Sequence, residues 1–192
     1  MNINNSITST IFKDISFSEK EVVFINSKFE KIELTKGDIL INPNIHVHSQ
    51  YYIFGGCLRS FFIDAVGKEH TIQFAIKDWW ISDYTSFFTS EKSIMNIECI
   101  QDATIYKFSK ENMDGLCAQF QKIEFFFRKK LEIAFAGFQK RILDNLSKPA
   151  KERYLQFVKR YPNIEQSVKN YHIASYLGIT TESLSRIRKI TS

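Results

Sequence analysis

Polar and basic side chains near the end of the chain have types and spacing that suit contact with nucleic acid. The candidate DNA-contacting residues are Thr180, Thr181, Glu182, Ser185, Arg186, Arg188 and Lys189. In a helix over residues 181–190, Glu182, Arg186 and Lys189 fall on one face, because residues three and four apart are neighbours on a helix. An arginine can donate two hydrogen bonds to one guanine, a glutamate can accept one from the cytosine amino group, and a lysine can pair with a phosphate. We interpret this face as a candidate surface for reading duplex DNA.

Two short helices joined by a glycine turn are predicted to position that face. The apolar residues that would pack the two helices together are Ile173, Ala174, Leu177, Leu184 and Ile187. Between them, Gly178 can take the left-handed backbone conformation that ends a helix, and Thr180 is a favourable N-cap for the next one. This is the pattern of a helix-turn-helix. An ordinary helical hairpin with a solvated charged face has the same pattern.

The charge distribution favours the nucleic-acid interpretation. The chain has 192 residues and a net charge of +5. From residue 147 to the end there are nine lysines and arginines against three acidic residues, whereas residues 1–146 carry seventeen against eighteen. The basic excess therefore lies in the part that holds the two short helices, as expected of a module that binds phosphates.

The end of the chain resembles a known family at several positions. The residues that carry the resemblance are Ile173, Ala174, Gly178, Thr180, Glu182, Ser185, Arg186, Ile187 and Lys189. Their order resembles the DNA-binding helices of the cyclic-AMP receptor and fumarate–nitrate regulator (CRP/FNR) family of bacterial transcription factors. The resemblance implies that Glu182 and Arg186 read bases and that Thr180 contacts a phosphate, with Ser185, Arg188 and Lys189 as candidates for backbone contacts. Thr181 stands where the family often has an arginine that reads guanine.

Upstream, the pattern indicates an α+β chain with three parts. We expect a β-roll sensor domain over residues 1–110, a dimerisation helix region over 111–146 and a helix-turn-helix domain over 147–192. Residues 29–108 contain six or more short β-rich runs separated by turn residues, including Gly55-Gly56 and Gln101-Asp102-Ala103. The order of these runs resembles the family's sensor domain, a jelly roll that binds cyclic nucleotides.

A long apolar seam predicts the middle part. Apolar residues recur every three or four positions from Leu116 to Ile142, which predicts one helix of about seven turns. So much apolar surface exceeds what one small β-domain can cover. We therefore expect residues 116–146 to form a homodimer interface, as the resemblance also implies; burial within one chain is the alternative.

The candidate effector pocket departs from the family pattern. Where the family has a Gly-Glu-Leu turn and an Arg-Ser pair that hold the cyclic nucleotide, this chain has Ile81-Ser82-Asp83-Tyr84 and Glu91-Lys92-Ser93. The pocket residues so assigned are Ser82, Asp83, Tyr84, Lys92 and Ser93. Aspartate is shorter than glutamate, and lysine lacks the forked guanidinium. We predict that cyclic AMP does not bind, and that the pocket holds another small molecule or is filled by the chain's own side chains.

The competing interpretation is a β-barrel that binds a small ligand or a metal and whose C-terminal helices mediate protein contacts. His46-Val47-His48 could supply two imidazoles from a strand edge, as in cupin metal enzymes. His70 is the only candidate for a third imidazole, and no carboxylate follows before Asp64. We therefore assign no metal and no cofactor.

The remaining features exclude several other classes. No arrangement typical of a hydrolase, a nucleotide-binding glycine loop or paired catalytic carboxylates occurs, so we expect a protein that is not an enzyme. The N-terminus has no basic-then-apolar signal and no apolar run approaches a membrane span, so we expect a cytoplasmic protein without membrane contacts. Three cysteines far apart indicate neither disulfides nor a metal knuckle.

Overall fold

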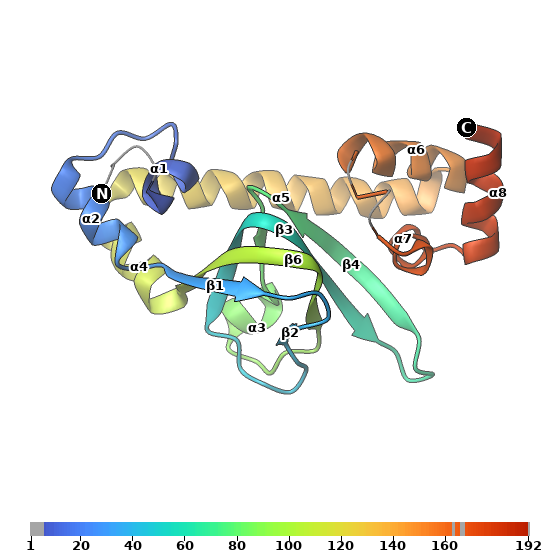
Figure 1. Cartoon of the computed structure of the whole chain (residues 1–192), viewed down its shortest axis with the longest axis horizontal. Helices are drawn as coiled ribbons and strands as arrows, with labels where there is room; N and C mark the ends of the chain where they lie inside the picture. The colour runs from blue at the N-terminus through green and yellow to red at the C-terminus, as the bar shows by residue number, and fades with distance from the viewer. Residues whose placement is uncertain (1–5, 163, 166–167, 192) are drawn as a thin grey trace.

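A long helix and an antiparallel sheet form the body of the molecule. The computed structural model describes residues 6–162, 164–165 and 168–191. The long helix, α5 (Gln121–Ser147), lies along the sheet, and shorter helices gather at its two ends (Figure 1). At one end are α1 (Ile7–Ile11), α2 (Glu19–Asn26) and α4 (Lys110–Gln119). At the other end are α6 (Ala150–Arg160), α7 (Asn170–Leu177) and α8 (Thr181–Thr191). This mixture of helices and antiparallel strands confirms the predicted α+β class.

Two long strands, β3 and β6, form the centre of the sheet. Among the described residues its six strands are β1 (Glu30–Leu34), β2 (Ile39–Ile41), β3 (Ser49–Ile63), β4 (Glu69–Ile76), β5 (Trp80–Ile81) and β6 (Asn96–Ser109). The main path runs β1-β6-β3-β4, with β2 added to β6 and β5 added to β3, and all pairs are antiparallel. A short helix, α3 (Tyr84–Thr89), follows β5. Because β4 ends the path, one of its edges pairs with no strand of the described residues.

Two predicted turns lie inside strands instead. Gly55-Gly56 lies within β3, and Gln101-Asp102-Ala103 lies within β6, so the prediction of separate strands there was wrong. Gly56 has φ +87°, and a Cβ at this position would come within 2.3 Å of the Asp102 carbonyl oxygen. The glycine therefore permits β6 to approach β3 at a bulge, where the pairing register shifts.

The predicted long helix is divided at Phe120. There the backbone is extended, with φ −127° and ψ 94°, and it separates α4 from α5. The break turns the ring of Phe120 toward Phe17, with their centroids 6.1 Å apart. It also leaves Leu116 of α4 and Ile123 of α5 in one buried cluster with the N-terminal helices. The three-to-four spacing therefore continues across a change of direction, which is why the sequence reads as one helix.

From Ile133 onward, α5 carries apolar side chains that the described part of the chain leaves largely exposed. Ile133, Phe135 and Leu146 are 70%, 72% and 81% exposed, respectively. By contrast, Ile123 and Phe127 near its start are buried. Ser147 ends α5 and α6 begins at Ala150, as Pro149 predicted.

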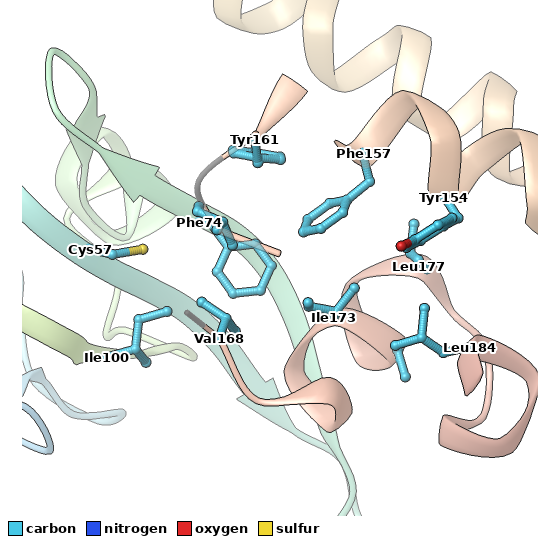
Figure 2. Close-up of a cluster of buried hydrophobic side chains, with 12 residues drawn as sticks. Cys57, Phe74, Ile100, Tyr154, Phe157, Tyr161, Val168, Ile173, Leu177 and Leu184 are labelled. Atoms are coloured by element: carbon cyan, nitrogen blue, oxygen red, sulfur yellow. The ribbon is translucent and has the colours of Figure 1, made fainter. Parts of the chain in front are cut away.

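Helices α6, α7 and α8 share one buried cluster with the sheet (Figure 2). Phe157, Ile173 and Leu184, from the three helices in turn, pack in the cluster that also contains Phe74 of β4. The rings of Phe74 and Phe157 meet edge to face at 6.0 Å. The three C-terminal helices are therefore docked on β4 by an apolar core.

Candidate nucleic-acid interface

The turn between α7 and α8 follows from Gly178 and Thr180. Gly178 has φ 64° and ψ 37°, the left-handed conformation that glycine adopts without strain, and it ends α7. Thr180 then starts α8, because its hydroxyl accepts a hydrogen bond from the Ser183 amide at 3.2 Å. Both predictions from the sequence are confirmed. Two residues thus fix where the exposed helix begins.

Helix α8 has one buried side and one polar side. Leu184 is fully buried and Ile187 packs against the same cluster, as predicted. The exposed residues of the helix and its cap that the sequence singled out are Thr180, Thr181, Glu182, Ser185, Arg186 and Lys189. Figure 1 shows α8 at the far end of the molecule from the N-terminal helices. The structure therefore brings six of the seven candidate residues to solvent on one helix and its N-cap.

The polar face has few contacts of its own. Within the described residues, Arg186 donates one hydrogen bond, to the hydroxyl of Ser183 at 3.4 Å, and Thr181 donates one to Glu182 at 3.2 Å. The pKa of Glu182 is lowered, chiefly by the backbone N–H at the start of the helix and then by the hydroxyls of Thr180 and Thr181. Glu182 is therefore a carboxylate at neutral pH, and it remains able to accept a hydrogen bond from a ligand.

Arg188 lies apart from the other candidates. Its Nε atom is 3.2 Å from a carboxylate oxygen of Glu165, and its guanidinium also donates to the Asn170 side chain. The same Glu165 carboxylate accepts a hydrogen bond from the Tyr154 hydroxyl. In this structure Arg188 ties α8 to α6 and to the start of α7, on the side away from Arg186.

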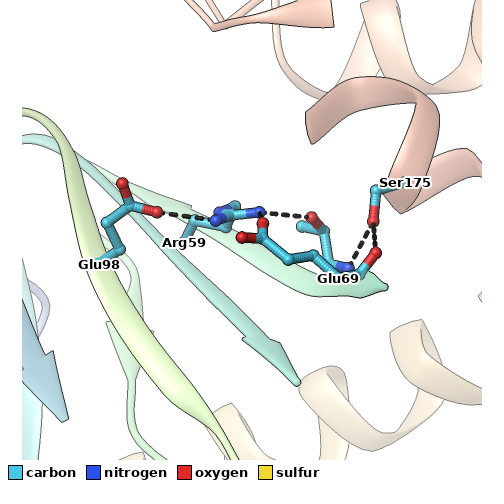
Figure 3. A network of polar contacts seen from close by, with 5 residues as sticks. Arg59, Glu69, Glu98 and Ser175 are labelled. Carbon is cyan, nitrogen blue, oxygen red and sulfur yellow. Dashed lines mark hydrogen bonds and ion pairs between the residues drawn. The ribbon is translucent and has the colours of Figure 1, made fainter. Parts of the chain in front are cut away.

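A hydrogen-bond network fastens α7 to the edge of the sheet (Figure 3). The Ser175 hydroxyl accepts from the Thr71 amide at 2.9 Å and donates to the Glu69 carbonyl at 2.8 Å. The Glu69 side chain pairs at 2.7 Å with Arg59, which is 1% exposed and also pairs with Glu98 at 2.7 Å. We did not predict this anchor from the sequence. Its one local signal is a serine within the otherwise apolar face of α7.

A second contact fixes the end of α7 from behind. Arg153 of α6 donates to the Leu177 carbonyl at 2.6 Å and to the Asn145 side chain of α5 at 3.1 Å. An arginine near a helix C-terminus pairs favourably with its unbonded carbonyl groups. Helices α5, α6 and α7 are thereby joined at one point just before the turn into α8.

The candidate effector pocket is closed around Asp83. This carboxylate is fully buried and caps α3 by accepting from the amides of Thr85 and Ser86 at 3.0 and 3.3 Å. Its second oxygen accepts from the Ser93 hydroxyl at 2.8 Å and the Ile94 amide at 3.1 Å. The hydrogen-bonding groups of Asp83 and Ser93 are therefore already occupied by partners within the chain.

The other three predicted pocket residues point in different directions. Ser82 is buried and donates to the Ser49 carbonyl at 2.9 Å. Lys92 is exposed, and its backbone pairs with that of His46 in an isolated antiparallel β-bridge. Tyr84 lines a groove beside α5 and donates to Gln50 at 3.3 Å. The structure does not bring the five together around one space.

The histidines of the competing interpretation are not arranged as metal ligands. His46 and His48 are stacked with ring centroids 6.2 Å apart, and Nδ1 of His46 is 3.0 Å from the Ser90 carbonyl. His70 contacts Asp64 at 2.7 Å and stacks on Phe62. In the part of the chain that the structure describes, no three His, Cys, Asp or Glu side chains gather to hold a metal.

None of the helices built from the described residues is long and apolar enough to cross a membrane. The charged residues of α5 interrupt its apolar ones throughout its length.

The fold is shared with solved transcription regulators. No protein-family model matches the chain, and no curated protein matches it in sequence. The global regulator CLP from Xanthomonas campestris, described as responsive to c-di-GMP, is 11% identical with a TM-score of 0.69, over 88% of each chain. A CooA mutant from Carboxydothermus hydrogenoformans is 16% identical with a TM-score of 0.70, over 97% of this chain and 84% of that one. A protein from Eubacterium rectale, described as a CRP/FNR-family regulator, is 17% identical with a TM-score of 0.70, over 94% and 85%.

Proposed function

We propose that this chain, which has the fold of the CRP/FNR transcription regulators, is itself a cytoplasmic transcription regulator that binds duplex DNA. In this proposal α7 and α8 are the helix-turn-helix, the sheet is the family's jelly-roll sensor, and α8 is the recognition helix. The single observation that carries it is the two-sided character of α8. Its apolar side is locked into a core, while its polar side is exposed with Arg186 and Glu182 able to accept new partners.

The residues on α8 divide by what they can contact. Arg186 and Glu182 are the base readers, because a guanidinium can bond guanine twice and a carboxylate can accept from cytosine. Thr180, Thr181, Ser185 and Lys189 supply hydroxyl and ammonium donors for phosphates. Arg188 supports the helix through Glu165 and contacts DNA only if that ion pair opens.

A homodimer through α5 would place two copies of α8 on one DNA. The exposed apolar residues of the second half of α5 give a partner helix a surface to bury. A two-fold pair of recognition helices reads a palindromic site, with half-site centres about 34 Å apart along the duplex. The boundary at Ser147-Lys148-Pro149 separates the dimer helix from the DNA-binding helices in this scheme.

The closed surroundings of Asp83 support a regulator that cyclic AMP does not control. A cyclic phosphate needs unoccupied donors, and here the hydroxyl of Ser93 already donates to Asp83. The effector, if one exists, therefore binds elsewhere in the sensor or differs in chemistry.

Fluorescence anisotropy with labelled random-sequence duplex DNA across a salt series tests the proposal. Binding should weaken steeply as salt rises, because phosphate contacts release counterions. Lys189→Ala should reduce the slope of log affinity against log salt by about one contact, whereas Lys20→Ala, on the exposed side of α2, should leave it unchanged. No binding at low salt by a folded protein would reject the proposal. Selection of a preferred operator from the random pool would follow a positive result.

A further inference from the structure

Arg153 of α6 contacts both the last turn of α5 and the end of α7 with one terminal nitrogen. That nitrogen donates to the Leu177 carbonyl at 2.6 Å and to the Asn145 side chain at 3.1 Å. It also lies 3.8 Å from the point where a Cβ would stand on Gly178. The guanidinium therefore touches the end of α5 and the turn that leads into α8 at the same time.

The Leu177 carbonyl accepts from Arg153 because it lies at the end of a helix. The last four carbonyls of an α-helix have no amide partner further along the same helix. The chain after α7 satisfies an earlier carbonyl, since the Ile179 amide bonds back to Ala174 at 3.0 Å. Arg153 satisfies the last one, and its positive charge also suits the negative end of the helix dipole.

The corner between α5 and α6 is braced separately. The Lys148 amide donates to the Asp144 carbonyl at 2.9 Å, and the Lys148 ammonium pairs with the Asp144 carboxylate at 2.7 Å. The Arg153 amide donates to the Pro149 carbonyl at 3.2 Å, which places Arg153 one helical turn after this corner. Its side chain thus extends a braced corner to α7.

An apolar core alone would define the direction of α8 less well. Ile173, Leu177 and Leu184 pack in the shared cluster, but the burial of apolar surface has no preferred direction. A hydrogen bond weakens as its angle departs from linear, and a guanidinium is planar with its donors in fixed directions. Two acceptors on one nitrogen of Arg153 therefore restrict the angle between α5 and the turn into α8.

A small change of angle at this turn becomes a large displacement along α8. The helix has 11 residues. At 1.5 Å per residue it is about 16 Å long, so a tilt of about 10° at its start moves its far end by about 3 Å. Neighbouring base pairs are about 3.4 Å apart along the duplex. The angle that Arg153 restricts is therefore comparable to one base pair of half-site spacing.

We propose that Arg153 is a positioning residue that sets which half-site spacing the dimer accepts. This role rests on the proposed function, because it needs two copies of α8 joined through α5. Arg153 acts through the Leu177 carbonyl and the turn at Gly178, without contacting DNA. Without the guanidinium, each α8 still reads its own half-site, but the separation of the two helices is no longer fixed.

Binding to two operators that differ only in spacing tests this role. One is the operator selected from random duplex DNA, and the other carries one extra base pair between its half-sites. Wild type should bind the longer operator about 100-fold more weakly, because only one half-site is then engaged at a time. Arg153→Gln should reduce this ratio to about tenfold or less, with its affinity for a duplex carrying a single half-site within about twofold of wild type. Fluorescence anisotropy measures all three affinities.

Three further variants separate positioning from stability. Arg153→Lys keeps the positive charge at the end of α7 but replaces the planar fork with a flexible ammonium. Its melting temperature should stay near that of wild type, while its spacing ratio falls as in Arg153→Gln. Asn145→Ala, at an exposed position of α5, removes only one acceptor and should lower the ratio about threefold. Lys159→Gln, also exposed on α6, is the matched control for loss of one charge and should leave the ratio unchanged.

The possible failures are distinguishable. An unchanged spacing ratio in both folded Arg153 variants would overturn the positioning role and leave the DNA-binding proposal intact. Equal binding of both operators by wild type would do the same, because no spacing would then be set. If Arg153→Lys matches wild type in both melting temperature and spacing ratio, the charge alone matters and the positioning role is wrong. No DNA binding by folded wild-type protein would reject the transcription-regulator proposal, and the positioning role with it.

Discussion

The polar residues of α8 and those around Asp83 differ in where their hydrogen bonds go. Those of α8 face solvent, whereas those around Asp83 bond to their own chain. Among the described residues, Arg186 on α8 makes one weak hydrogen bond, to Ser183, and its side chain is exposed. Asp83 accepts four hydrogen bonds from its own chain and is fully buried. Both positions were singled out by resemblance to one family. The difference shows that resemblance to a family selects residues by type, without indicating whether their hydrogen bonds remain available to a ligand.

Removal of the Asp83 carboxylate should have the largest effect on stability. Asp83→Ala leaves three backbone amides and the buried Ser93 hydroxyl without their acceptor, and should lower the free energy of unfolding by about 3 kcal/mol. Urea unfolding followed by circular dichroism measures this loss. The exposed Lys92→Ala is the control, expected within about 0.5 kcal/mol of wild type. An equally stable Asp83→Ala would mean that Asp83 is not the structural centre described above.

Arg186→Ala should show the reverse pattern. Its stability should match wild type, while discrimination between the selected operator and a variant operator falls by about 1–3 kcal/mol. Competition binding with the two duplexes provides the measurement, with Lys189→Ala expected to weaken both alike. If Arg186→Ala retains full discrimination between the two duplexes, Arg186 does not read the operator sequence.

Acid should loosen the core that supports α8. Burial, with the positive charges of Arg59 and Lys169, lowers the pKa of His172 from 6.5 to about 4. The unfolded chain therefore binds this proton more tightly, so this contribution to stability is complete above pH 6.5 and falls by about 3 kcal/mol as pH approaches 4. Chemical denaturation between pH 4 and 7 should show the loss, and His172→Gln should lack this component. Identical pH profiles for the two proteins would contradict it.

Ser175→Ala should weaken the docking of α7 by about 1 kcal/mol, because the Thr71 amide loses its acceptor. Hydrogen exchange at that amide should become about fivefold faster, while core amides of β3 are unaffected. Ser185→Ala, on the exposed face of α8, should leave exchange in β4 as in wild type. Unchanged exchange in Ser175→Ala would show that the hydroxyl contributes little to docking.

Cyclic AMP should have the smallest effect of all. Calorimetric titration should give no measurable affinity, because Asp83 and Ser93 are bonded to each other. Micromolar affinity would show that the surroundings of Asp83 open to bind a ligand. The two regions would then no longer differ in whether their hydrogen-bonding groups are available.

The parts of the structure that the sequence predicted are those with local causes. Gly178, Thr180 and the spacing of Ile173 and Leu177 act within a few residues, and together they predicted the helix pair and its exposed face. Pro149 likewise predicted the boundary after α5. The anchor between Ser175 and β4 joins residues more than 100 positions apart, so no local sequence pattern predicts it.

The errors arose where tertiary contacts changed the meaning of a local signal. Gly56 reads as a turn, but it is needed because Asp102 of β6 approaches too closely for a side chain. Phe120 continues the helical spacing, but its ring belongs to the N-terminal core and the helix breaks there. The polar residues around Asp83 could be identified by type, whereas their closure on each other depends on how α3 folds against Ser93.

The Ser175 hydroxyl also has a consequence for solubility. Strand β4 is an edge of the sheet, and its outward amide and carbonyl at Thr71 and Glu69 are occupied by this one side chain. If α7 were to leave the sheet, it would expose an unpaired edge next to Phe74, which is the kind of surface on which strands of different molecules pair and aggregate. A single serine on α7 thus also covers this edge of the sheet against pairing with another molecule.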